Sequence, residues 1–112
     1  MNNISFDDFM KVEICVGTIL TAEINNNLNN PAIVLTIDFG KKIGIKKSSA
    51  QLIANYTCDS LIKRQILAVV NFPPRQVGKI ISEVLVLGLS DNNNQPVLIS
   101  PDSNIKNGKK LY

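Results

Sequence analysis

The sequence predicts an all-β fold, a small five-stranded barrel with short helices, and three observations support this prediction. Short apolar runs rich in β-branched residues recur along the chain, and polar turn residues separate them. Gly17 interrupts the first run, as is common where a barrel strand bends or carries a bulge. The 112 residues suffice for one modest core, so we expect a single domain over residues 1–112.

The N-terminal third predicts a short helix and two strands. Ser5 is a suitable N-cap for a helix over residues 5–10, with two acidic residues in its first turn. Residues 12–23 and 32–39 predict the first two strands. The asparagine-rich segment 25–30 between them predicts a surface loop.

The remaining elements follow in an order that defines the topology. We expect a turn at residues 40–42, a third strand at 42–47, a serine-capped helix at 48–56 and a further helical turn at 57–62. Two strands at 65–72 and 84–89 then precede a short strand at 96–100 and a polar tail. Three strands, a short helix and two strands in a chain of this length indicate an OB-fold, a five-stranded Greek-key barrel.

The fourth and fifth strands do not alternate as a strand with one wet face should. Residues 66–70 (ILAVV) and 84–89 (VLVLGL) are almost entirely apolar. Either this chain covers both faces of these strands or a second copy covers the outer face. A chain this small has little mass to spare, so we favour a homodimer.

Composition argues against an enzyme. The chain has no histidine, which removes Ser–His and Cys–His nucleophile pairs and the usual zinc ligands. Its nine acidic residues form no motif, so we expect no cofactor and no metal. We expect Cys15 and Cys58 to be unpaired thiols. No run approaches the about 18 apolar residues of a membrane span, and the N-terminus lacks a secretory pattern, so we expect a cytoplasmic protein.

Charge is unevenly distributed. Residues 1–40 carry one Lys against five Asp and Glu, whereas residues 41–112 carry eleven Lys and Arg against four. The net charges of −4 and +7 suggest a basic surface, for which nucleic acid is the usual partner. Ordinary solubilising lysines are the alternative interpretation.

Two basic segments are candidate binding sites. The link at residues 73–79 between the fourth and fifth strands begins with two prolines and carries Arg75 and Lys79. It either presents these cations to an anion or only turns the chain. Lys46 and Lys47 precede two serines at the expected helix start, where free amides favour an anion. Their alternative role is that of solvated lysines beside a cap.

Four segments carry a resemblance to a known family. They are FMKVEICVGTI (9–19), LTIDFGKKIGIKKSSAQ (35–51), VVNFPPRQVG (69–78) and SEVLVLG (82–88). The sequence resembles the tRNA-binding domain family almost end to end, and most closely its free-standing, homodimeric CsaA branch. One departure is Cys15, which stands where the family commonly has an arginine.

The resemblance implies an OB-fold that binds tRNA or another structured RNA without catalysis. The candidate RNA contacts are Lys46, Lys47, Ser48, Ser49, Asn71, Arg75, Lys79 and Ser82. Asn71 could instead bond the loop backbone, and Arg75 could pair with Glu83. Exposed aromatic residues are few, which favours recognition of backbone charge and shape over base stacking.

The CsaA branch also implies an alternative, a chaperone that binds unfolded preproteins and associates with the export machinery. Such a protein needs an exposed apolar groove. The candidates for this groove, or for a dimer interface, are Phe6, Phe9, Met10, Phe72 and Val77. Composition does not separate these two roles.

Overall fold

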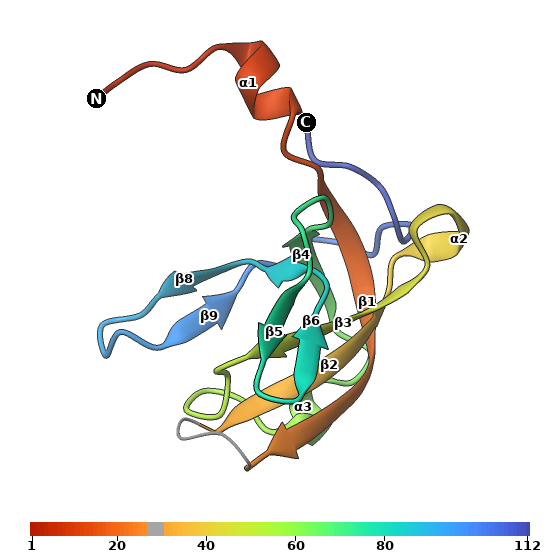
Figure 1. The fold of residues 1–112 in the computed structure, drawn as a ribbon, viewed down its shortest axis with the longest axis vertical. Coiled ribbons are helices and arrows are strands. Elements are labelled where there is room, and N and C mark those ends of the chain that lie inside the picture. Colours follow the sequence, from red (N-terminus) through yellow and green to blue (C-terminus); the bar gives the residue numbers. More distant parts are fainter. Residues whose placement is uncertain (27–30) are drawn as a thin grey trace.

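The computed structural model describes residues 1–26 and 31–112, and its centre is a strongly curled five-stranded sheet (Figure 1). All strand pairs are antiparallel, in the order β3-β2-β1-β4-β7. The strands are β1 (Ile14–Asn25), β2 (Ala32–Asp38), β3 (Ile45–Ala50), β4 (Gln65–Val69) and β7 (Leu85–Val86). The predicted fold class, an all-β barrel of OB type, is confirmed.

The sheet curls because its longest strand is bent. β1 pairs with β2 along one part of its length and with β4 along the other, and its register with β2 shifts between Ile19 and Thr21. The predicted bulge therefore lies near Leu20, whereas pairing with β4 continues through Gly17. Gly17 has a different role: a Cβ there would lie 2.6 Å from the Ile37 side chain and 2.7 Å from the Phe39 ring.

The core fills the concave side of the curled sheet. Its largest side chains are all at most 2% exposed: Ile19, Ile33, Leu35, Ile37, Phe39, Leu52, Leu61 and Ile66. They come from β1, β2 and β4, from Phe39 directly after β2, and from the connection between β3 and β4. That connection contains α3 (Cys58–Leu61), which Thr57 begins with a reciprocal capping box to Ser60.

The predicted helix at residues 48–56 is wrong. β3 continues to Ala50, with Ser48 opposite Leu35 and Ser49 opposite Val34. Strand pairing outweighs the local serine cap because Ser48 is 2% exposed and packs inside the barrel. The helical turn expected at residues 57–62 is present as α3, and the turn expected at 40–42 is the one-turn helix α2 (Gly40–Ile43).

Two hairpins stand out from the barrel. The link expected at residues 73–79 contains β5 (Arg75–Val77), which turns at Gly78 and pairs with β6 (Ile80–Ser82). The fifth strand expected at 84–89 divides into β7 and β8 (Gly88–Ser90), and β8 pairs with β9 (Pro96–Leu98).

The turn between β8 and β9 is closed by a carboxylate, which gives the fold an acid-sensitive element. Asp91 accepts hydrogen bonds from the backbone N–H groups of Gln95 (3.0 Å) and Asn93 (2.8 Å) and from the Asn55 side chain (2.9 Å). These bonds, above all the one from Gln95, lower the pKa of Asp91 below its ordinary value of 3.8.

We predict that acid loosens this hairpin before the rest of the fold. A carboxyl group whose folded-state pKa is lowered stabilises the fold above its unfolded-state pKa and loses that contribution as pH falls through the folded-state value. Amide hydrogen exchange at Asn93 and Gln95 should therefore show faster opening below about pH 4. Asp91→Asn should remove this pH dependence, and exchange that accelerates equally in both proteins would contradict the assignment.

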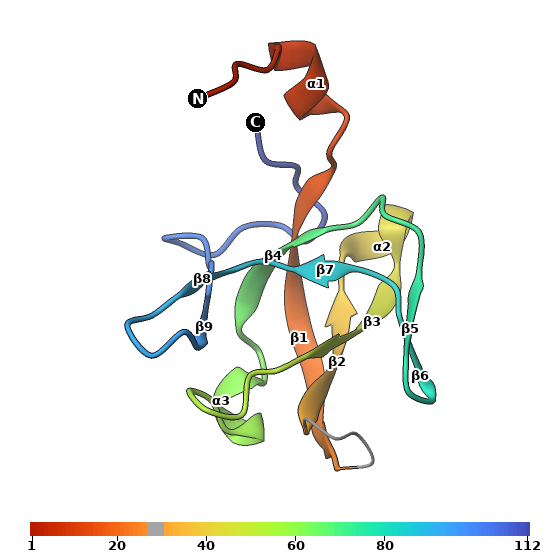
Figure 2. The ribbon, with the colours of Figure 1, turned by 60° about the vertical axis from the view of Figure 1, so that its left-hand side comes forward.

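Helix α1 (Phe6–Met10) and the C-terminus lie at the same end of the molecule, away from the hairpin between β8 and β9 (Figures 1 and 2). α1 begins at Ser5, whose side chain accepts the Asp8 N–H at 3.0 Å as predicted. None of its residues is buried. The C-terminal tail runs beside β1, where the Lys109 carbonyl accepts the Val16 N–H at 3.0 Å.

The two continuous apolar runs, residues 66–70 and 84–89, differ in how far this chain covers them. Every residue of β4 is buried or half-buried within this chain, and the Leu67 N–H donates to the Ile99 carbonyl of the C-terminal segment. This chain therefore covers both faces of β4. In the second run, by contrast, this chain leaves Leu85 and Leu89 49% and 67% exposed.

Candidate nucleic-acid interface

The segment between β6 and β7 closes the barrel against β3. The Glu83 N–H donates to the Lys47 carbonyl at 2.8 Å, and the Lys47 N–H donates to Glu83 Oε1 at 3.0 Å. Ser48 Oγ donates to the Val84 carbonyl at 3.1 Å, and Ser82 Oγ accepts the Ser49 N–H at 3.1 Å. Three of the predicted RNA contacts, Ser48, Ser49 and Ser82, therefore form a seam of the barrel.

We predict that Ser48→Ala lowers the free energy of unfolding by about 0.5–1.5 kcal/mol, because the Val84 carbonyl loses its shorter hydrogen bond and keeps only the 3.4 Å bond from Ser82 Oγ. Since Ser48 faces the interior, its removal should leave RNA affinity within about twofold. Chemical denaturation and an RNA titration of one preparation measure both effects. A large loss of RNA affinity with unchanged stability would return Ser48 to the binding surface.

A polar cavity of about 440 Å³ lies between the outer face of β1–β3 and the β5–β6 hairpin. Thr21 of β1, Thr36 of β2 and Lys47 of β3 are register partners in one row across the three strands. Lys79, in the turn of the hairpin, lines the same cavity. Its lining is Thr21, Glu23, Ile24, Asn25, Val34, Thr36, Lys47, Gly78, Lys79 and Ile80.

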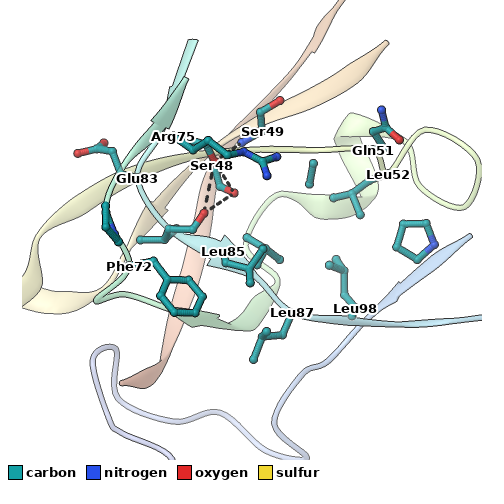
Figure 3. A pocket seen from close by; sticks show the side chains of 17 residues that line it. Ser48, Ser49, Gln51, Leu52, Phe72, Arg75, Glu83, Leu85, Leu87 and Leu98 are labelled. Atoms are coloured by element: carbon teal, nitrogen blue, oxygen red, sulfur yellow. Dashed lines mark hydrogen bonds between the residues drawn. The ribbon is translucent and has the colours of Figure 1, made fainter. Parts of the chain in front are cut away.

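An apolar groove, also of about 440 Å³, lies between β3 and β7. In Figure 3 the Phe72 ring lies beside Leu85, with Leu87 and Leu98 also in the groove. Leu52 lines it as well, and Arg75 and Glu83 contribute polar atoms. The β5–β6 hairpin therefore borders both hollows, because Arg75 lines the apolar groove and Lys79 the polar cavity.

The predicted RNA contacts therefore separate. The structure brings Lys47 and Lys79 to one cavity. Lys46 instead pairs with Glu83, with 3.9 Å between Lys46 Nζ and Glu83 Oε2. Arg75 lines the apolar groove and does not pair with that carboxylate. No helix begins at Ser48, so the helix-terminus anion site proposed for Lys46 and Lys47 is wrong.

Asn71 takes the backbone role that was its alternative. Its side-chain amide donates to the Lys11 carbonyl at 2.7 Å, and its Oδ1 accepts the Glu13 N–H at 2.9 Å. Asn71 therefore fastens the segment between α1 and β1 to the end of β4. Both polar ends of the side chain are used in this clamp.

Of the five predicted apolar contacts, Phe72 alone lines the apolar groove. Phe6, Phe9 and Met10 lie on α1, and Val77 is half-buried in β5. Sequence reasoning missed Thr21 and Thr36 because small polar residues on a strand are common on any wet sheet face. Only the register shows that they align with Lys47.

The cysteines carry no visible chemistry. Both are free, as predicted, and Cys15 is 4% exposed. Burial, and then the charge of Glu13, raise the pKa of the Cys15 thiol, and Lys110 partly offsets this. In residues 1–26 and 31–112, no three His, Cys, Asp or Glu side chains are grouped so as to hold a metal ion.

The family model described as "Putative tRNA binding domain" matches residues 14–110. The chain belongs to the tRNA-binding domain family. Its similarity to solved structures places it in the CsaA branch. It is 42% identical to the chaperone CsaA of Bacillus anthracis, with a TM-score of 0.93 and coverage of 99% of this chain and 100% of that one. It is 44% identical to the CsaA chaperone protein of Picrophilus torridus, with a TM-score of 0.89 and coverage of 98% and 100%.

Curated relatives of the tRNA-binding domain include much longer enzymes. The chain is 28% identical to the methionine–tRNA ligase of Parabacteroides distasonis, over 97% of this chain and 16% of the ligase. It is 32% identical to that of Acidithiobacillus ferrooxidans, over 96% and 16%. The chain thus spans about a sixth of each ligase and corresponds to a binding domain. Among the residues described, every helix is too short or too polar to cross a bilayer.

Proposed function

We propose that this protein binds tRNA or a similarly structured RNA without catalysis, through the polar cavity between β1–β3 and the β5–β6 hairpin. One observation carries the proposal: Lys47 and Lys79 line one cavity on the strand face and hairpin that OB-folds use for nucleic acids. Membership of the tRNA-binding domain family supports RNA as the partner.

The side chains favour contact with the RNA backbone. The lysines supply charge to phosphates, and the threonine hydroxyls of the row are donors for phosphate or ribose oxygens. Within residues 1–26 and 31–112, no aromatic side chain lines the cavity. Stacking of unpaired bases therefore contributes little here, and shape and charge supply the recognition.

The proposal is tested by titrating labelled tRNA at several salt concentrations. Each phosphate contact contributes about 0.7–0.9 to the slope of log K against log salt. Lys47→Gln/Lys79→Gln should lower the slope by about 1.4–1.8 and the affinity about tenfold at low salt. Lys11→Gln/Lys63→Gln, which removes two other exposed lysines, is the matched control. Salt-independent binding, or equal losses in both variants, would contradict the site.

A second candidate function, a chaperone for unfolded preproteins, is favoured by the apolar groove. Phe72 and Leu85 both line it and are each 49% exposed, so an extended apolar segment has access to them. The two similar CsaA proteins, of Bacillus anthracis and Picrophilus torridus, are named as chaperones. A role at the export machinery, and a place in the cytoplasm, stay predictions.

The groove is tested by the aggregation of a chemically denatured client. Phe72→Ser/Leu85→Ser should abolish suppression of aggregation and leave tRNA affinity unchanged. Ile62→Ser, at a 37% exposed apolar position outside the groove lining, is the control. If the groove variant protects the client as well as the wild type does, the chaperone function does not reside there.

We further propose that a second copy of the chain packs against the N-terminal arm, residues 4–10. Ile4 and Phe6 are 72% and 71% exposed, and a five-residue helix is not stable without packing partners. Phe6→Ser should shift sedimentation equilibrium toward the monomer. A wild-type protein that is monomeric at all concentrations would refute the homodimer.

A further inference from the structure

A second group of lysines surrounds a cavity away from the polar cavity, where α2 meets the C-terminal tail. A hollow of about 730 Å³ is lined by Lys41 and Lys42 of α2 and by Lys106 and Lys109 of the tail. Phe39, Gly40, Ile43, Asn107 and Gly108 complete its lining. We call it the lysine pocket. Among the residues that the structure describes, its lining carries four cations and no carboxylate, whereas the polar cavity has two lysines and Glu23.

The backbone that presents these lysines is held in place. The tail pairs with β1, since the Gly108 N–H donates to the Val16 carbonyl at 2.8 Å and the Val16 N–H donates to the Lys109 carbonyl at 3.0 Å. Asn107 Oδ1 accepts from Thr18 Oγ1 at 2.7 Å and from the Gln65 side chain at 3.2 Å. The tail is therefore a fixed strap across the barrel and not a loose basic end.

Two glycines allow α2 and this strap to touch. Gly40 and Gly108 both have positive φ, at 87° and 91°. A Cβ on Gly40 would lie 2.8 Å from the Asn107 carbonyl oxygen, and one on Gly108 would lie 2.5 Å from that of Phe39. Asp38 fixes the other side by accepting the Gly40 N–H at 2.8 Å. Lysines from the two segments are thus brought together by a contact between their backbones.

The four lysines are not neutralised by neighbouring side chains. All four are exposed, and the two ion pairs found within residues 1–26 and 31–112 involve Lys11 and Lys46 instead. Four like charges around one hollow repel each other, so their arrangement does not stabilise the fold by itself. An anion with several charged oxygens would relieve this repulsion.

We propose that the lysine pocket is a second phosphate-binding surface for the same structured RNA, an inference that rests on the proposed function. α2 follows directly from β2, and β3 follows directly from α2, so the pocket is joined to the face that carries Thr36 and Lys47. Thr36 and Gly40 are four residues apart, which is about 13 Å along an extended chain. An RNA that spans this distance along β2 and α2 would contact both surfaces.

Continuity with the polar cavity favours RNA over an acidic polypeptide. An RNA backbone carries one negative charge per nucleotide and is long enough to extend from one surface to the other. The lysines of the polar cavity and those of the lysine pocket therefore contact phosphates of the same RNA. Two separate surfaces that contact one RNA also explain why the lysines of residues 41–112 do not all lie around the polar cavity.

The test is a tRNA titration against salt with Lys41→Gln/Lys42→Gln/Lys106→Gln/Lys109→Gln. All four sites are exposed, so thermal unfolding should stay close to that of the wild type. The slope of log K against log salt should fall by about 3, and affinity at low salt by at least tenfold. Lys11→Gln/Lys63→Gln removes two charges elsewhere and is the matched control for the half variant Lys106→Gln/Lys109→Gln, whose slope should fall by about 1.4–1.8. Hydroxyl-radical footprinting should show one protected RNA segment lost.

The outcomes separate the two proposals. If wild-type protein does not bind tRNA, the proposed function fails and the lysine pocket with it. If wild-type protein binds and the Lys47/Lys79 variant is impaired, but the pocket variant matches its control, only the pocket is overturned. Polyglutamate that binds the wild type and not the pocket variant, with tRNA affinity unchanged, would identify an acidic polypeptide as the pocket's partner and overturn the inference.

Discussion

Gly17→Ala is expected to lower the free energy of unfolding by about 3 kcal/mol, because overpacking a rigid core typically costs 1–3 kcal/mol. The new methyl group would lie 2.6 Å from the Ile37 side chain and 2.7 Å from the Phe39 ring. These side chains are 0% and 1% exposed, so neither has room to retreat. The midpoint of thermal unfolding should fall by about 10–20 °C.

Gly44→Ala is the comparison for backbone strain without overpacking, since no atom of the described residues lies within 4 Å of a Cβ at that position. Its positive φ of 91° makes any cost one of backbone conformation rather than packing. Combining Gly17→Ala with Phe39→Leu should restore part of the loss, and a double-mutant cycle measures this coupling. Additive losses would show that Gly17 does not make room for the Phe39 ring.

Lys47→Glu/Lys79→Glu is expected to lower tRNA affinity at low salt by about a hundredfold or more. The substitution removes two phosphate partners and places two negative charges in a cavity that already contains Glu23. Both positions are exposed, so the fold should tolerate it. Isothermal titration at low salt provides the measurement.

Arg75→Glu is the informative comparison for this charge reversal. Arg75 belongs to the same hairpin as Lys79 but lines the apolar groove. Its reversal should reduce tRNA affinity much less than the Lys47/Lys79 reversal does. A larger effect at Arg75 would transfer the RNA surface to the groove and contradict the division between the two faces of the hairpin.

The succession of the main strands along the chain could be predicted from the sequence, because apolar runs alternate with turn residues. The helix over residues 48–56 could not, since its serines look like caps until the partner of Ser48, the Val84 carbonyl, is known. That partner lies 36 residues away, beyond the reach of local patterns. The sequence did not predict the β5–β6 hairpin either, because the two prolines before Arg75 indicate a loop and β5 is only three residues long.

The candidate site was predicted in part. Charge pattern and family resemblance together pointed to Lys47 and Lys79, which line one cavity. The same reasoning included Asn71 and Ser82, whose side chains bond within the protein. It omitted Lys106 and Lys109, because a basic tail looks solvated in sequence until its pairing with β1 is seen.

The most direct test of the proposed RNA-binding surface is amide hydrogen exchange of the wild-type protein with and without tRNA. Protection is expected on the outer face of β1–β3 and at the turn of the β5–β6 hairpin, around Thr21, Thr36, Lys47 and Lys79. Residues of the apolar groove, such as Leu85 and Leu98, should exchange as in the free protein. Protection confined to that groove, with exchange unchanged at Lys47 and Lys79, would contradict the proposed RNA surface.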